Sequence, residues 1–161
     1  VPNALWYFRY AALFTFLTGL YLIHYLSIAI NISIILGAVM GTLMFLNVWL
    51  IIWPNQKKVI AGAPDAADAG AKAGLASRTN TLFSIPMLWF MVYSAHGSAV
   101  GNVLLSVEES LTALWVGLLI ILAIEANAVF GKMNAAITSV KAVIHSGIAL
   151  TIILGLLVCY L

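Results

Sequence analysis

Five long apolar runs, separated by polar links, dominate the pattern of the chain. Most of them have close to the roughly 20 residues that a helix needs to cross the hydrocarbon core of a bilayer, and the third is the shortest. A membrane β-barrel would instead show short segments of alternating polarity. The pattern predicts an all-α integral membrane bundle, one domain over residues 1–161, with about five transmembrane helices near 5–30, 33–53, 81–96, 111–130 and 137–161.

The longest polar interruption is a connector over residues 54–80, between the second and third predicted helices. It is rich in Ala and Gly, and residues 66–77 are consistent with two structures, a short helix on the membrane surface or a loosely packed linker. We expect the side chain of Asn80 to cap the third helix. The connector is therefore predicted to lie outside the bilayer.

Two features predict how the helices pack. Gly37 and Gly41 lie four residues apart in the second predicted helix, and this spacing of small residues lets another helix approach closely. Pro86 lies inside the third predicted helix, where its ring and missing N–H favour a kink that frees a backbone carbonyl. Both features favour close contact of these helices with neighbours.

The basic residues segregate in this five-helix arrangement. With five crossings, the N-terminus, the connector and the link after the fourth helix share one side. That side holds every Lys and Arg of the chain: Arg9, Lys57, Lys58, Lys72, Arg78, Lys132 and Lys141. The opposite links hold Glu108 and Glu109 and no basic residue. Because basic residues mark the cytoplasmic side, the predicted topology is multi-pass, N-in/C-out, with a cytoplasmic connector.

Composition narrows the class of protein further. The chain is 64% hydrophobic and only 7% charged, whereas soluble domains carry roughly 25% charged residues. Its net charge of +2 includes no basic cluster beyond Lys57-Lys58, so the expected partner is the lipid bilayer and not nucleic acid. The single cysteine, Cys159, excludes an internal disulfide and a Cys-x-x-Cys-His haem attachment.

Two histidines are candidate cofactor ligands. His24 and His96 both fall toward the outer ends of predicted helices, and ionisable side chains near the membrane interior are candidates for function. If their helices touch, neutral imidazoles could hold a haem b iron or a copper ion. The alternative is a boundary histidine bonded to a carbonyl or to water.

A second polar group lies deeper in the apolar runs. Lys141 and His145 share one face of the fifth predicted helix, and Glu125 lies at a similar depth on the fourth. A pair between Glu125 and either residue would let the carboxylate stay in the membrane at tolerable cost. Asn47 lies at a similar depth and is expected to bond another helix, either in this group or at groups freed near Pro86. A structural pair and a proton path or subunit contact are both consistent with this network.

A third group gathers at the cytoplasmic ends of the second and third predicted helices. Its interpretation is open between an anion or substrate site and a set of caps and topology signals. This cytoplasmic motif consists of Asn55, Gln56, Lys57, Arg78 and Asn80.

The polar stretch and its flanks resemble a known family. The runs Gly37-Ala-Val-Met-Gly-Thr42 and Asn47-Val-Trp-Leu-Ile-Ile-Trp-Pro-Asn-Gln-Lys57, followed by Ser77-Arg-Thr-Asn80 and Pro86-Met-Leu-Trp-Phe-Met91, are similar to the membrane domain of the bacterial membrane-bound urate oxidase (urate hydroxylase) family. The resemblance covers about 7–96, with a weaker hydrophobic match to the fourth helix. It implies a redox-linked setting in the bacterial inner (cytoplasmic) membrane.

Departures from the family pattern limit what the resemblance implies. Family members are longer and commonly end in a haem-c domain, so we expect a shortened relative that lacks this domain. The family pattern has a His just before the glycine matched by Gly37, where Ile35 or Leu36 stands here, and an acidic residue where Ala11 stands. The fifth helix shows no clear counterpart. The fold and the redox setting carry over, but urate chemistry does not.

Two functional hypotheses follow, and the sequence leaves enzymatic activity open. The first is an integral membrane subunit of a larger redox or respiratory-type complex, with a structural or accessory role beside other membrane subunits. The second is a haem- or metal-bearing membrane oxidoreductase domain. A small transporter is a third hypothesis, against which the lack of an inverted repeat argues.

Overall fold

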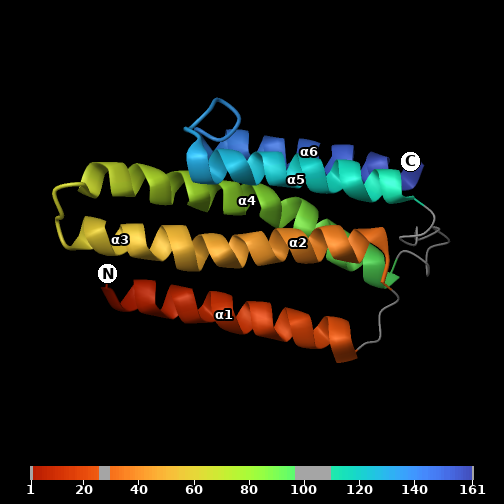
Figure 1. Ribbon diagram of the computed structural model, residues 1–161, viewed down its shortest axis with the longest axis horizontal. Coiled ribbons are helices and arrows are strands. Elements are labelled where there is room, and N and C mark those ends of the chain that lie inside the picture. The colour runs from red at the N-terminus through yellow and green to blue at the C-terminus, as the bar shows by residue number, and fades with distance from the viewer. Residues whose placement is uncertain (1, 26–29, 97–109, 161) are drawn as a thin grey trace.

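The computed structural model describes residues 2–25, 30–96 and 110–160, and every long element in this part of the chain is a helix (Figure 1). The predicted end of the first helix at residues 26–29 and the outer link with Glu108 and Glu109 lie outside the described residues. The elements are α1 (Pro2–Tyr25), α2 (Ile32–Leu46), the π-helical segment η1 (Asn47–Ile52), α3 (Trp53–Ile60), α4 (Ala66–His96), α5 (Leu111–Phe130) and α6 (Val140–Tyr160).

These elements form five helical rods, because α2, η1 and α3 continue one another from residue 32 to residue 60. The all-α prediction is confirmed, and α5 has the predicted bounds. The last helix begins at Val140, three residues later than predicted. Its start is set by Ser139, whose Oγ accepts a hydrogen bond from the N–H of Ala142 at 3.1 Å, as an N-cap residue does.

The predicted connector is the largest difference from the sequence prediction. Only residues 61–65 separate α3 from α4, and α4 includes residues 66–80 in one helix of 31 residues. Residues 66–77 are therefore helical, as one alternative held, but they belong to a long packed helix. The physical reason is composition, since Ala has the highest helix propensity and the Ala-rich stretch has no internal proline.

The short turn between α3 and α4 is well specified by its residues. Gly62 has φ +64°, and the N–H of Ala63 bonds the carbonyl of Lys58 at 3.1 Å, which is the pattern of a Schellman C-cap. Across the turn, the Lys58 ammonium lies 2.7 Å from the Asp65 carboxylate. The hydrogen bond from Lys58 holds the pKa of the Asp65 carboxyl below its ordinary value.

Helix α4 organises the core. It packs most extensively against α2 on one side and α6 on the other. Phe83 and Phe90 of α4 are fully buried in a hydrophobic cluster that also draws on α2, α5 and α6. The close approach predicted at Gly37 is confirmed, because a Cβ there would lie 3.4 Å from Met91 Cγ and from Phe90 Cβ of α4.

The outer surface of the bundle is apolar. Large hydrophobic side chains such as Leu50, Trp115 and Leu119 point outward. Three rods are long and apolar enough to cross a membrane: Ile32–Ile60, Leu111–Phe130 and Val140–Tyr160. Contact with a lipid bilayer follows from these spans. By composition, α1 and α4 are not among them, because α1 carries polar aromatics and α4 has a polar first half.

The ends of the helices alternate along the bundle (Figure 1). The N-terminus and the turn at 61–65 lie toward one end, and the link at 131–139 faces the same way but lies further in, beside the first half of α4. The ends of α1, α4 and α6, with the start of α2, lie at the other end. The basic residues of the chain belong to the helix turns next to the first end or to the surroundings of the link at 131–139.

The close packing of α6 on α4 predicts a sharp difference between two glycines. A Cβ at Gly147 would lie 2.8 Å from Ile85 Cδ1 and 3.2 Å from the Leu82 carbonyl oxygen, whereas one at Gly74 meets nothing within 4 Å. Gly147→Leu should lower the free energy of unfolding by about 1–3 kcal/mol because of overpacking. Gly74→Leu, the matched control, should raise it through helix propensity. Unfolding in mixed micelles measures both, and equal effects would show that α4 and α6 do not pack as described.

Candidate functional site

The π-helical segment places one amide in the middle of the bundle. Asn47 begins η1 and is only 1% exposed. A π-helical turn is wider than an α-helical turn and often marks a functional site. At the end of the segment the N–H of Trp53 bonds the carbonyl of Val48, five residues earlier. The shifted register suits Pro54, which has no N–H to donate.

Asn47 joins three rods through its side chain. Its Nδ2 donates to Asn80 Oδ1 of α4 at 2.9 Å and to Glu125 Oε2 of α5 at 3.1 Å. Asn80 Nδ2 in turn donates to the Met44 carbonyl oxygen at 3.0 Å. We call Asn47, Asn80 and Glu125 the amide–carboxyl cluster. Within it, the neutral amide of Asn47 donates to one oxygen of the half-buried Glu125 carboxyl, which lowers the cost of placing this group among apolar helices.

This cluster corrects two predictions. Asn80 does not cap a helix, because α4 begins at Ala66 and places Asn80 in its interior. Glu125 is bonded to Asn47 and forms no ion pair with Lys141 or His145, whose side chains are exposed. Lys58–Asp65 is the one ion pair among the described residues. Of the two alternatives that the sequence left open for Asn47, the structure has the hydrogen bond to Glu125.

Helix rotation explains why Lys141 and His145 lie apart from Glu125. The face of α6 that packs inward carries Val143, Gly147 and Leu150. The two residues share a face with each other, as their spacing predicts, but that face is turned outward.

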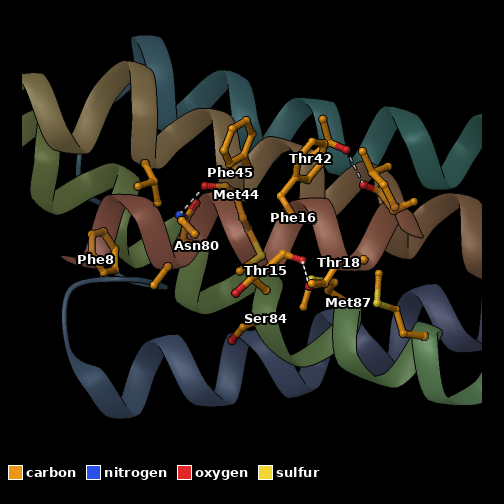
Figure 2. A pocket seen from close by; sticks show the side chains of 18 of the residues that line it. Phe8, Thr15, Phe16, Thr18, Thr42, Met44, Phe45, Asn80, Ser84 and Met87 are labelled. Carbon is orange, nitrogen blue, oxygen red and sulfur yellow. Dashed lines mark hydrogen bonds between the residues drawn. The ribbon is translucent and has the colours of Figure 1, made fainter. Parts of the chain in front are cut away.

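A cavity of about 690 Å³ lies beside the cluster, between α1 and the α2–η1 and α4 rods. Figure 2 shows Asn80 and Met44 in its wall with their hydrogen bond, and Phe16 of α1 beside Phe45 of α2. These two rings stack with centroids 4.5 Å apart and planes 5° apart. The cavity thus has a mixed aromatic and amide wall.

The polar groups of the cavity wall are neutral. Among the described residues that line it there is no Lys, Arg, His, Asp or Glu. Several of its hydroxyls bond carbonyls of their own helices, as Thr42 does with Ala38 at 2.8 Å and Ser84 with Thr81 at 2.7 Å. They therefore leave mainly acceptor sites toward the cavity. Such a wall suits an uncharged ligand.

Arg9 attaches α1 to the continuous rod formed by α2, η1 and α3. Its guanidinium carbon lies 4.0 Å from the ring centroid of Trp53, 4.8 Å from that of Trp49 and 4.6 Å from that of Tyr10. In the sequence analysis Arg9 counted only as a basic residue of the cytoplasmic side. A signal was present in the sequence, since Phe45, Trp49 and Trp53 recur at four-residue intervals and form one stripe.

The two candidate cofactor ligands lie near the same end of the bundle. His24 and His96 fall in the last turns of α1 and α4, and both helices end on the same side of the bundle in Figure 1. Both side chains are exposed. In the described part of the chain, no three or more His, Cys, Asp or Glu side chains come together in a way that could hold a metal ion.

The residues of the predicted cytoplasmic motif do not form one site. Asn55 Nδ2 bonds the Ile51 carbonyl within its own rod at 2.8 Å, and Lys57 lies over the Trp53 ring. Arg78 Nη1 donates to the Ile137 carbonyl at 3.1 Å, so it binds the link before α6. Gln56 is half-buried, and Asn80 belongs to the amide–carboxyl cluster. Each contact is better described as local structure than as a shared anion site.

Comparison with known proteins gives one match. A family model described as urate oxidase N-terminal matches residues 29–158. The match includes α6, for which the resemblance showed no counterpart, and it begins after α1, which the resemblance had included from Tyr7. No curated protein and no solved structure matches significantly.

The amide–carboxyl cluster predicts a specific loss of stability. Asn47→Leu leaves Asn80 Oδ1 and Glu125 Oε2 without their donor, so the free energy of unfolding should fall by about 1–3 kcal/mol. Glu125→Gln keeps an acceptor for Asn47 and should cost less. The control Asn127→Leu replaces an amide of α5 outside the cluster and should stay within about 0.5 kcal/mol. Unfolding in mixed micelles measures the free energy of unfolding of each variant. An Asn47→Leu protein as stable as the wild type would refute the structural role of the cluster.

Proposed function

The chain belongs to the urate oxidase N-terminal family, and we propose that it is an integral membrane subunit of a larger redox assembly, with a structural or accessory role. The observation that carries this proposal is the extent of the family match, which includes all three apolar spans and the α4 core helix. The outward apolar side chains supply the surface for lipid and for neighbouring membrane subunits.

The contacts of the polar residues support an accessory role. Asn47 ties three rods together, Arg78 holds the link before α6, and Arg9 fastens α1 through aromatic rings. Each of these residues is engaged in holding helices together. A catalytic residue would instead need a group aimed at a reacting atom.

For the topology, we propose that α1 and α4 also cross the bilayer, which gives five crossings. At 1.5 Å per residue, the 24 residues of α1 and the 31 of α4 extend roughly 36 and 46 Å, enough to cross roughly 30 Å of hydrocarbon. Both helices run alongside the rod 32–60, and their last turns lie toward the same end of the bundle as the start of α2 (Figure 1). With the basic end in the cytoplasm, the topology is N-in/C-out in the bacterial inner membrane.

The second candidate function is a haem- or metal-bearing oxidoreductase domain. It is favoured by one observation, the position of His24 and His96 in helix turns at the same end of the bundle. Two neutral imidazoles are sufficient axial ligands for a haem iron. The two candidates differ in a property that is visible by eye, the colour of the purified protein.

Purification in mild detergent tests the two functions against each other. We expect the protein to copurify with other membrane chains in fixed ratio and to show no haem absorption of its own. Haem bands that persist in the isolated chain and vanish in both His24→Ala and His96→Ala would instead establish the second function. His145→Ala is the matched control, because His145 is exposed on α6 and far along the chain from both residues. A colourless chain that migrates alone in every mild detergent would refute the first function.

Cysteine labelling tests the topology. In a Cys159→Ser background, Lys58→Cys should react with a membrane-impermeant reagent only after the cytoplasmic face is opened, because Lys58 lies at the basic end. Glu108→Cys, at a position outside the described residues, should react in intact cells. Labelling of both positions from the same side would show that the number of crossings between them is even.

A further inference from the structure

From the shape and chemistry of the cavity beside α1, we infer that it binds a neutral lipid of the quinone class, with the carbonyl-bearing ring at Asn80 and the apolar tail along α1. The inference concerns a ligand site of this chain. It rests on the proposed function at one point only: the redox setting is the reason for choosing a quinone among the neutral lipids.

The cavity is elongated along the helices. Its α1 wall extends from Phe8 to Ile23, which at 1.5 Å per residue corresponds to roughly 22 Å. The α4 wall extends from Ser77 to Met91 and matches this length. A compact ligand would leave most of such a space empty, whereas an extended chain fills it.

The wall changes character along its length. On α4 the first part carries Ser77, Asn80, Thr81 and Ser84, and the later part carries Met87 and Met91. Methionine side chains adapt to irregular apolar partners. This gradient belongs to the α4 side of the wall, since Thr18 and Thr42 lie beside Met87 (Figure 2), and along α4 it fits a ligand with a polar end near Asn80 and an apolar tail that points toward Met91.

Asn80 offers a suitable donor at the polar end. Its amide nitrogen carries two hydrogens, and the Met44 carbonyl takes one of them. Its oxygen already accepts from Asn47. The remaining N–H is free to donate to a ligand carbonyl, and the stacked rings of Phe16 and Phe45 supply an aromatic wall beside it.

The absence of charge in the wall excludes most other lipids. A fatty acid or a phospholipid would bring a carboxylate or a phosphate, and no basic side chain lines the cavity to meet it. A quinone is neutral and presents carbonyl acceptors on a flat ring with an apolar tail. These are the properties that the wall selects.

Gly19 provides a clean way to block the site. It lies in the α1 wall of the cavity, and a Cβ built on it meets nothing within 4 Å. A Cβ therefore fits there without contact, and we expect a larger side chain to take up space in the cavity. Gly74 shares this freedom but does not line the cavity, so substitutions there are matched controls.

The test is to titrate the purified chain in detergent with a decyl benzoquinone and to follow binding by the quenching of tryptophan fluorescence. Wild-type protein and Gly74→Phe should bind about one quinone with equal affinity, and Gly19→Phe should bind at least about tenfold more weakly, a loss of about 1.4 kcal/mol. Gly19→Leu should show a smaller loss, and it replaces Gly19→Phe if that protein is not monodisperse. Equal binding by the Gly19 and Gly74 variants would overturn the site.

Two further arms decide the chemistry of the ligand. Decanol, which has the tail without the ring, and a short-chain phospholipid should each fail to displace the quinone at equal concentration. The infrared carbonyl stretch of bound quinone should lie at a lower frequency than that of quinone in protein-free micelles, because Asn80 donates a hydrogen bond to the carbonyl. Displacement by either lipid, or an unshifted band, would overturn the quinone assignment. Copurification of other subunits is measured separately, so failure of this proposal is distinguishable from failure of the proposed function.

Discussion

The hydrogen bonds of one buried amide, Asn47, are the constraint on which the arrangement of the core depends. Inside an apolar bundle a polar side chain must find its partners on other helices, since neither water nor lipid supplies them. Asn47 satisfies this need by donating to Asn80 on α4 and to Glu125 on α5. These bonds set the relative rotation of three rods, because a helix turned away would leave a carboxyl group unpaired among apolar side chains.

The other features of the core are consistent with this constraint. The π-helical turn that begins at Asn47 carries the second rod past Pro54 without a break. Gly37 on α2 and Gly147 on α6 let both helices approach α4 closely enough for side chains of Asn length to reach across. Helix α1 is attached differently, through Arg9 and stacked rings, and the cavity lies along this less tightly packed boundary. The molecule thus combines a rigid four-rod core with one peripheral helix.

This division agrees with the family match, which covers the four-rod core from residue 29 and not α1. The shared domain is therefore the part of the fold that the amide–carboxyl cluster and the glycine contacts hold together. The boundary with α1 is where the cavity lies. A chain built in this way keeps its fold through internal contacts and presents an apolar outer surface to lipid.

The sequence by itself determined the helices, their apolar outer faces and the segregation of basic residues toward one end, because these properties depend on local composition and on distance along the chain. It determined α5 to the residue, and it singled out Asn47 and Glu125 as a polar group that needs partners. It failed at residues 54–80, where Ala-rich helix propensity outweighed the polar appearance of the stretch.

Only the tertiary structure decided which partners the polar residues have. Spacing along a helix places Lys141 and His145 on one face, but it cannot say that this face turns outward while Val143 and Gly147 turn in. The choice of Asn80 as the partner of Asn47, and the cavity beside it, arise from the rotation and close approach of separate helices. Such packing depends on the fit of side chains from distant parts of the chain, which a pattern of single positions does not record.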